Sequence, residues 1–212
     1  MPQLDARPLL FVISGPSGAG KGLALERIAA AGEVRRIPTY TTRSPRADEQ
    51  DGVEYNFVNL DIFYKMHEDG TIFEYTRTYS DSYYGSPSLL LKADDPTPMA
   101  VELDPMGFVR VRATSNRNVI GIFVTTNTES ELRARLAARG QGKELEQRLR
   151  VRVNQQTWSW VYDYVLINKD RGEFLRELDT VIEGELIRNK GARHVVQLRQ
   201  HLDPTLHEDE EP

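Results

Sequence analysis

A glycine-rich turn between a predicted strand and a predicted helix is the feature that most constrains this chain. Residues 9–14 read LLFVIS, a continuous apolar run, and residues 23–31 place apolar side chains at helical spacing. The turn between them reads GPSGAGK over residues 15–21. In a strand, loop and helix context this pattern is typical of a phosphate-binding loop, whose glycines let the backbone wrap around phosphate oxygens while a lysine reaches the outer phosphates. A plain glycine-rich turn is the alternative.

The residue after the lysine departs from the usual pattern. Such loops normally have Ser or Thr there, and its hydroxyl binds Mg²⁺. This chain has Gly22, and Leu23 does not replace the hydroxyl. Phosphate binding is still expected, but magnesium would be held by phosphate oxygens, water and a carboxylate.

Short apolar runs elsewhere predict further buried strands, because their apolar residues are contiguous instead of alternating. These strands are residues 99–103, 119–124 and 164–167. Helix-like sequence separates them, including a capping box that starts at Thr128. The predicted helices are residues 128–140, 144–158 and 174–186. The alternation predicts an α/β fold with a parallel sheet core flanked by helices on both faces.

Residues 36–98 interrupt this rhythm. They are rich in Pro, Thr, Ser, Tyr and Asp, and their clear helical patch is 61–68, ended by Gly70. We interpret this segment as an inserted, substrate-facing region that is partly strand. Residues 139–148 form a polar, glycine-containing interruption that is short enough to move as a flap.

Length and composition predict a single globular domain. The chain has 212 residues, of which 39% are hydrophobic and 28% charged, and it has no cysteine, which fits a reducing compartment. Its longest apolar stretch, 8–13, is far shorter than the roughly 20 residues that cross a bilayer. Residues 1–7 lack the order of a signal peptide. We therefore expect a cytoplasmic protein without membrane contact.

The charge is concentrated in the last ten residues. The formal net charge is −5, and residues 203–212 hold five acidic residues and no Lys or Arg, so the rest of the chain has 27 basic and 27 acidic residues. A neutral body argues against a general nucleic-acid binder. The tail is expected to be flexible. The four histidines are too scattered for a His-based metal site.

Two arginines three residues apart form a second candidate site. Residues 39–46 read TYTTRSPR, and residues 51–57 read DGVEYNF. Arg43 and Arg46 can close on a phosphate monoester with a nearby tyrosine, because each guanidinium offers a planar fork of donors. Alone, the same run would be an ordinary turn with solvated arginines.

Together with the phosphate-binding loop, these segments resemble the guanylate kinase family. Other segments carry the resemblance in the family's order over about residues 9–186: 72–75, 83–86, 102–104, the arginine-rich stretch 135–148, and 164–168. The resemblance implies a P-loop nucleoside monophosphate kinase fold. It divides the chain into a core (8–35, 98–130 and 155–190), an inserted mixed-sheet monophosphate-binding region (36–97) and a small lid (about 135–150).

The resemblance also implies roles for individual residues. The residues expected to bind ATP are Gly15, Pro16, Ser17, Gly18, Ala19, Gly20, Lys21, Gly22 and, near the adenine, Asn168. Those expected to neutralise the transferring phosphoryl group are Lys21, Arg43, Arg135, Arg139 and Arg148. Those expected to hold the acceptor phosphate are Arg43, Arg46, Tyr55 and Tyr84. Those expected around the base are Thr39, Glu74, Ser86 and Asp104, with Glu74 accepting from guanine N1–H and the 2-amino group. Glu102 or Asp104 is a possible magnesium ligand, mostly through water.

The resemblance therefore predicts transfer of the γ-phosphoryl group of ATP to GMP or dGMP with Mg²⁺. Four departures from the family pattern, Gly22, Pro87, Glu102 and Pro105, cluster around the magnesium and the base. They leave open a relative that phosphorylates another nucleoside monophosphate. A catalytically inactive interaction module is a further alternative, although Lys21 and the arginines count against it. The sequence does not indicate the oligomeric state.

Overall fold

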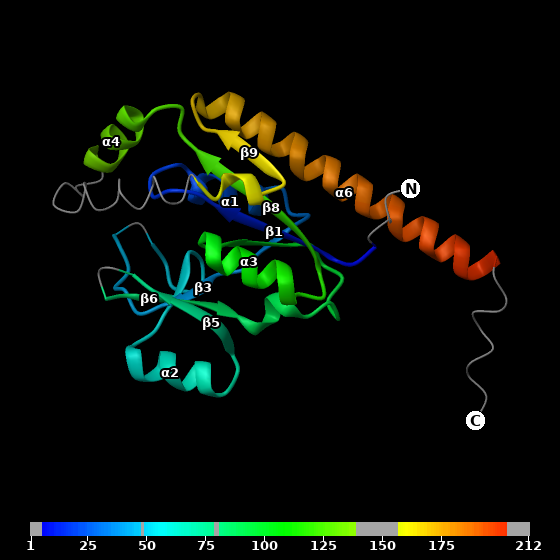
Figure 1. The fold of residues 1–212 in the computed structure, drawn as a ribbon, viewed down its shortest axis with the longest axis horizontal. Helices are drawn as coiled ribbons and strands as arrows, with labels where there is room; N and C mark the ends of the chain where they lie inside the picture. The colour runs from blue at the N-terminus through cyan, green and yellow to red at the C-terminus, as the bar shows by residue number, and fades with distance from the viewer. Residues whose placement is uncertain (1–5, 48, 79–80, 139–156, 203–212) are drawn as a thin grey trace.

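The protein is built on two β-sheets, and a computed structural model describes its residues 6–47, 49–78, 81–138 and 157–202 (Figure 1). The core sheet has the strand order β2-β7-β1-β8-β9, and all of its paired strands are parallel. Its strands are β1 (Leu9–Ser14), β2 (Arg35–Arg36), β7 (Met99–Glu102), β8 (Asn118–Thr125) and β9 (Tyr164–Ile167). The predicted parallel sheet and its four predicted strands are confirmed, and β2 is a further strand that the sequence did not predict.

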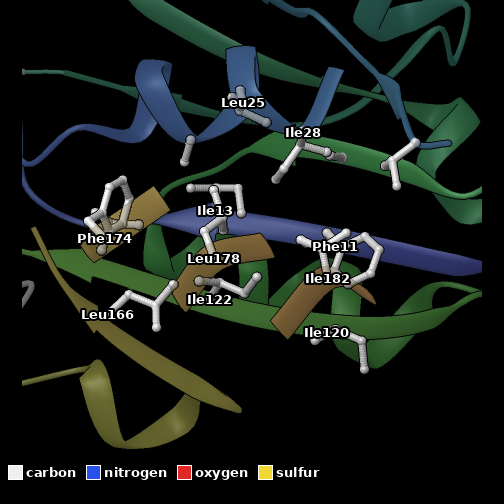
Figure 2. Close-up of a cluster of buried hydrophobic side chains, with 14 of the residues drawn as sticks. Phe11, Ile13, Leu25, Ile28, Ile120, Ile122, Leu166, Phe174, Leu178 and Ile182 are labelled. Atoms are coloured by element: carbon white, nitrogen blue, oxygen red, sulfur yellow. The ribbon is translucent and has the colours of Figure 1, made fainter. Parts of the chain in front are cut away.

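The central strand β1 is fully buried along its length. One of its faces packs against α1 (Lys21–Ala30) and α6 (Arg171–Leu202), through side chains such as Phe11, Leu25 and Phe174 (Figure 2). The other face packs against α3 (Pro105–Thr114) through Val12, Phe108 and their neighbours. Helices therefore cover both faces, which is why the apolar runs in these strands are contiguous.

A second, mixed sheet lies within the segment that interrupts the sequence rhythm. Its order is β4-β3-β6-β5, with β3 parallel to β4 and antiparallel to β6. The strands are β3 (Thr39–Thr41), β4 (Tyr55–Phe57), β5 (Ile72–Arg77) and β6 (Tyr83–Pro87). Helix α2 (Leu60–Glu68) packs on this sheet through Phe63, and its N-terminus is capped by Asn59, whose Oδ1 accepts from the Ile62 N–H at 2.9 Å. Short 3₁₀ turns cover Ser88–Leu91 and Ser159–Val161.

One predicted helix differs in length from the structure, and another lies mostly outside the described residues. The last helix is longer than predicted and runs from Arg171 to Leu202. Most of the helix predicted over 144–158 lies outside the described residues, and its last two residues, 157–158, form a turn. Helix α4 (Glu129–Ala138) begins where the capping box predicts, with Thr128 Oγ1 accepting from the Glu131 N–H at 3.2 Å. Most of the predicted lid and the acidic tail are also outside the described residues. No helix in the described part of the chain is long and apolar enough to cross a membrane.

Candidate functional site

The loop between β1 and α1 has the backbone of a phosphate cradle. Gly15, Gly18 and Gly20 have φ angles of +137°, +84° and +111°, a region that strongly favours glycine. A Cβ on Gly15 would lie 2.0 Å from the Val124 carbonyl oxygen, so a side chain does not fit. Helix α1 starts directly after Gly20, which has no side chain to cap it. The first N–H groups of the helix are therefore available to an anion.

Lys21 lies across this loop. Its Nζ donates to the carbonyl oxygens of Gly15 at 2.8 Å and Pro16 at 3.0 Å. The same ammonium lies 3.5 Å from Glu102 Oε1 at the end of β7. The loop carbonyls and the Glu102 carboxylate thus hold the Lys21 ammonium beside the loop. A bound phosphate would replace these groups as partners of the ammonium.

Asn168 supports the loop from the end of β9. Its Nδ2 donates to the Ala19 carbonyl oxygen at 2.8 Å, and the residue is 4% exposed. A Cβ on Gly20 would lie 2.3 Å from that nitrogen, which is a second reason for glycine there. Arg135 on α4 donates from Nη2 to the Asn168 carbonyl oxygen at 2.7 Å. The structure thus gives Asn168 a positioning role, while its proximity to the adenine remains a prediction.

A pocket of about 960 Å³ is lined by residues of both sheets and of the loop. It contains Lys21 and Glu102 on the core side. It also contains every residue that the sequence predicts for the acceptor: Thr39, Arg43, Arg46, Tyr55, Glu74, Tyr84, Ser86 and Asp104. Strands of both sheets, the loop and the start of α1, far apart in the sequence, therefore line one cavity.

At one end of the pocket, Arg43 and Arg46 share the carboxylate of Glu49. Arg43 donates from Nη1 and Nη2 to the two Glu49 oxygens at 2.8 and 2.9 Å, and from Nε to the Tyr84 hydroxyl at 3.0 Å. Arg46 donates to Glu49 from its backbone N–H at 2.8 Å and from Nη1 at 3.4 Å. The Arg43 guanidinium also lies over the Tyr55 ring, 5.4 Å from its centroid. We call Arg43, Arg46, Glu49, Tyr55 and Tyr84 the phosphate end.

Glu49 is ionised in this arrangement although its side chain is only 7% exposed. Burial opposes its ionisation, but the hydrogen bonds from Arg43 and the Arg46 backbone outweigh burial and hold the pKa of the carboxyl below its ordinary value. At Tyr55 the pKa is shifted upward instead, because the negative charge of Glu102 and then burial both raise the pKa of the phenol. Tyr55 therefore stays protonated and can donate a hydrogen bond.

At the other end, Glu74 and Ser86 are paired across β5 and β6. The strand register is irregular between Ile72 and Glu74, a break of the kind that re-aims a side chain. The Ser86 hydroxyl donates to Glu74 Oε1, and Arg110 on α3 donates from Nη1 to Glu74 Oε2 at 2.7 Å. Asp104 lies beside them and caps α3 by accepting from the Gly107 N–H at 2.7 Å. We call Glu74, Ser86, Asp104 and Thr39 the base end.

Several contacts were not predicted from the sequence. Glu49 and Arg110, which hold the predicted binding residues, were not singled out, and neither was the link between Arg36 and Glu54 at 3.8 Å. The spacing of Arg46 and Glu49 is a weak local signal, since such i,i+3 pairs are common. Arg110 gives no local signal, because its partner Glu74 lies 36 residues away in the chain, on strand β5 of the second sheet. Two predicted catalytic residues, Arg139 and Arg148, lie outside the described residues.

Carboxylates line the pocket, but the described ones are not grouped around a common metal position. Among the described residues, no group of three or more His, Cys, Asp or Glu side chains is arranged to hold a metal ion. Glu102 faces the loop beside Lys21, whereas Oδ1 of Asp104 already accepts from the backbone. Of the two carboxylates predicted as magnesium ligands, Glu102 is the better placed.

A family model and curated relatives agree on one family. The family model for guanylate kinase matches residues 7–185. A guanylate kinase of Clostridioides difficile is 31% identical over 88% of this chain and 91% of its own length, and one of Zymomonas mobilis is 33% identical over 89% of each. The match to a Granulibacter bethesdensis guanylate kinase, 33% identical, covers 58% of this chain and 59% of that protein. The crystal structure of guanylate kinase from Anaplasma phagocytophilum has the same fold, with a TM-score of 0.67 at 24% identity over 86% of this chain and 88% of that one.

Proposed function

This chain belongs to the guanylate kinase family of nucleoside monophosphate kinases, and we propose that it transfers the γ-phosphoryl group of ATP to GMP or dGMP. The observation that carries the proposal is a single pocket with a phosphate-binding loop, an arginine and tyrosine cluster, and a carboxylate. The loop suits the donor triphosphate, the arginines suit the acceptor phosphate, and the carboxylate suits a base with N–H donors. A cytoplasmic location is part of the proposal and agrees with a cysteine-free chain.

The reaction needs positioning and charge neutralisation and no covalent intermediate. An oxygen of the acceptor phosphate bonds to the γ-phosphorus, the bond from that phosphorus to the bridging oxygen breaks, and ADP leaves with the bond's electron pair. Lys21 and the N–H groups of the loop would hold the outer phosphates of ATP. Arg43, Arg46 and the two tyrosines would hold the acceptor phosphate in line. Such electrostatic stabilisation is the main source of catalysis in phosphoryl transfer.

Arginines from the lid complete the proposal. By the family pattern, Arg135, Arg139 and Arg148 would neutralise the transferring phosphoryl group. Arg135 supports this role in that its guanidinium donates to the main-chain carbonyl oxygen of Asn168, the residue whose side chain bonds to the loop. A phosphate oxygen would take the place of that carbonyl oxygen.

Magnesium is proposed as the metal that accompanies ATP. The residues present fit an ion held largely by phosphate oxygens and water, with Glu102 as the carboxylate beside the loop. Gly22 offers no hydroxyl, so the protein would provide fewer direct ligands than in most phosphate-binding loops. The metal, when bound, would neutralise charge on the phosphates.

Discrimination among acceptors tests the proposed function. Purified protein is incubated with ATP, Mg²⁺ and each of GMP, dGMP, AMP, CMP, UMP and dTMP, and the diphosphate products are separated by chromatography. GDP and dGDP should dominate. Dominant product from another acceptor would instead favour a kinase of that nucleotide. Absence of any product from folded protein would favour an interaction module, and calorimetry with GMP and ATP would show whether nucleotides still bind.

A further inference from the structure

The Glu74 carboxylate at the base end is bonded to Arg110, an arginine of helix α3, which covers one face of the core sheet. Arg110 projects from α3, which contacts strands of both sheets, and its Nη1 donates to Glu74 Oε2 at 2.7 Å. Glu74 lines the pocket, whereas Arg110 is not among the residues that do. The Arg110 side chain is 46% exposed and that of Glu74 only 10%. An arginine outside the pocket lining is therefore bonded to a carboxylate that lines the cavity.

The hydrogen-bonding capacity of Glu74 fits this arrangement. An ionised carboxylate offers about four lone-pair sites. The Ser86 hydroxyl occupies one on Oε1, and Arg110 occupies one on Oε2. Within the described residues, one site on each oxygen is left, which matches a ligand with two adjacent N–H donors. Guanine has such a pair in N1–H and the 2-amino group, and adenine does not.

The charges around Glu74 show what the arginine adds. A Cβ on Gly107 would lie 3.3 Å from Glu74 Oε1 and 3.4 Å from Asp104 Oδ1, so two carboxylates flank this glycine. Two negative charges on either side of one glycine repel each other, and a cation bonded to one of them offsets the repulsion. Arg110 is the cation bonded to Glu74 among the described residues. Because the pair is partly exposed, its contribution to stability should be small.

We propose that Arg110 is a positioning residue that orients the Glu74 carboxylate toward a base with two adjacent N–H donors and thereby sets the preference for GMP over AMP. This inference rests on the proposed function. It adds a residue of the core, outside the pocket lining, to the determinants of acceptor choice. It also links acceptor choice to contact between the two sheets, since α3 packs on the core and Glu74 lies in the second sheet.

The test compares Arg110→Gln with a matched control on the same helix. Arg112 lies two residues away, is similarly exposed at 42%, and pairs with Asp163 at 2.8 Å, away from the pocket. Arg110→Gln should raise KM for GMP about tenfold and lower the preference for GMP over AMP about tenfold, with kcat within about twofold. Arg112→Gln should lower the melting temperature and leave that preference unchanged. Arg110→Lys should restore part of the preference, because it keeps the charge without the planar fork.

A second comparison shows whether Arg110 acts through Glu74. In a Glu74→Gln background, Arg110→Gln should produce no further change in the preference. Unchanged or tighter GMP binding in Arg110→Gln, or an equal loss in Arg112→Gln, would overturn the inference while leaving GMP phosphorylation by the wild type intact. Wild-type protein that neither binds GMP in calorimetry nor phosphorylates it would instead overturn the proposed function, and the inference with it.

Discussion

The two ends of the pocket present opposite charges to the cavity, and at each end a residue of the other charge holds the charged group in place. That supporting residue lines the pocket at the phosphate end and lies outside the lining at the base end. At the phosphate end, two arginines face the cavity and a carboxylate, Glu49, holds them. At the base end, the carboxylate of Glu74 faces the cavity and Arg110 holds it. Glu49 lines the pocket itself, whereas Arg110 stands outside its lining.

This difference bears on what happens when a ligand binds. A phosphate that reaches Arg43 must share the guanidinium with Glu49, because both Nη atoms already donate to that carboxylate. A base that reaches Glu74 finds acceptor sites still available, since Ser86 and Arg110 each occupy one of about four sites on the carboxylate. We therefore expect the base end to be preorganised and the phosphate end to exchange partners on binding.

Removing the central cation of the phosphate end should have the largest effect. Arg43→Ala should lower kcat/KM for GMP about 100- to 1,000-fold, because it removes a phosphate ligand and leaves Glu49 without its main partner. Arg46→Ala is the matched control, since the Arg46 side chain is more exposed and bonds Glu49 more weakly. Steady-state kinetics on both variants would measure this. A larger loss in Arg46→Ala than in Arg43→Ala would reverse the assigned order.

Neutralising the base-end carboxylate should have the next largest effect. Glu74→Gln should lower kcat/KM for GMP about 30- to 100-fold, since a buried hydrogen-bonding group then meets the wrong partner. Activity with AMP should change little. The measurement is the pair of kcat/KM values in wild type and variant. An equal loss with both acceptors would show that Glu74 supports the fold instead of reading the base.

Glu49→Gln should reveal the exchange at the phosphate end. It should lower the free energy of unfolding by about 1–2 kcal/mol, because Arg43 and Arg46 lose a buried counter-charge. Inorganic phosphate should then stabilise the variant more than the wild type, since the anion supplies the missing charge. Urea unfolding with and without phosphate measures both quantities. Equal stabilisation by phosphate would mean that Glu49 does not compete for the arginines.

The phosphate-binding loop is proposed to hold ATP whichever acceptor is bound. Gly22→Ser should therefore change the handling of ATP and magnesium without changing the choice of acceptor. A Cβ on Gly22 meets nothing within 4 Å, and the new hydroxyl should be accommodated at the start of α1. We expect kcat to rise, or the magnesium requirement to fall, by about twofold to fivefold, equally for GMP and dGMP. Magnesium titrations of both proteins would show this. An unchanged rate and requirement would mean that the missing hydroxyl is already compensated.

The smallest expected effect is the change with pH in the stability that Glu49 contributes. The pKa of Glu49 lies below its ordinary value of 4.5, so the unfolded chain binds more protons there as the pH falls. The stability that Glu49 contributes is complete above about pH 5 and is lost as the pH falls through the folded-state pKa. The difference in unfolding free energy between wild type and Glu49→Gln should therefore be constant above that pH and narrow below it. A difference that widens toward acid would contradict the ionised state assigned to Glu49.

Local sequence patterns predicted strand β1, the glycine-rich loop and helix α1. The contiguous apolar run of β1 and the glycines of the loop each depend on neighbours in the chain, so strand, loop and helix were predictable in order. The resemblance placed Glu74 and Arg43 in one site, and the structure brings both to one pocket. Arg110 was not predictable, because its role depends on packing α3 against β5, and no pattern in residues 105–114 encodes that contact. The length of α6 was underestimated because its apolar spacing weakens beyond Leu186, where propensity alone gives no clear end.

The most direct test of a pocket that reads phosphate at one end and guanine at the other is kcat/KM for GMP, IMP and AMP with the same protein. IMP keeps N1–H and lacks the 2-amino group, whereas AMP lacks both guanine-type donors at those positions. We predict the order GMP, then IMP about tenfold lower, then AMP at least about 100-fold below GMP. Equal values for GMP and AMP would contradict base reading by Glu74, and with it the proposed division of the pocket.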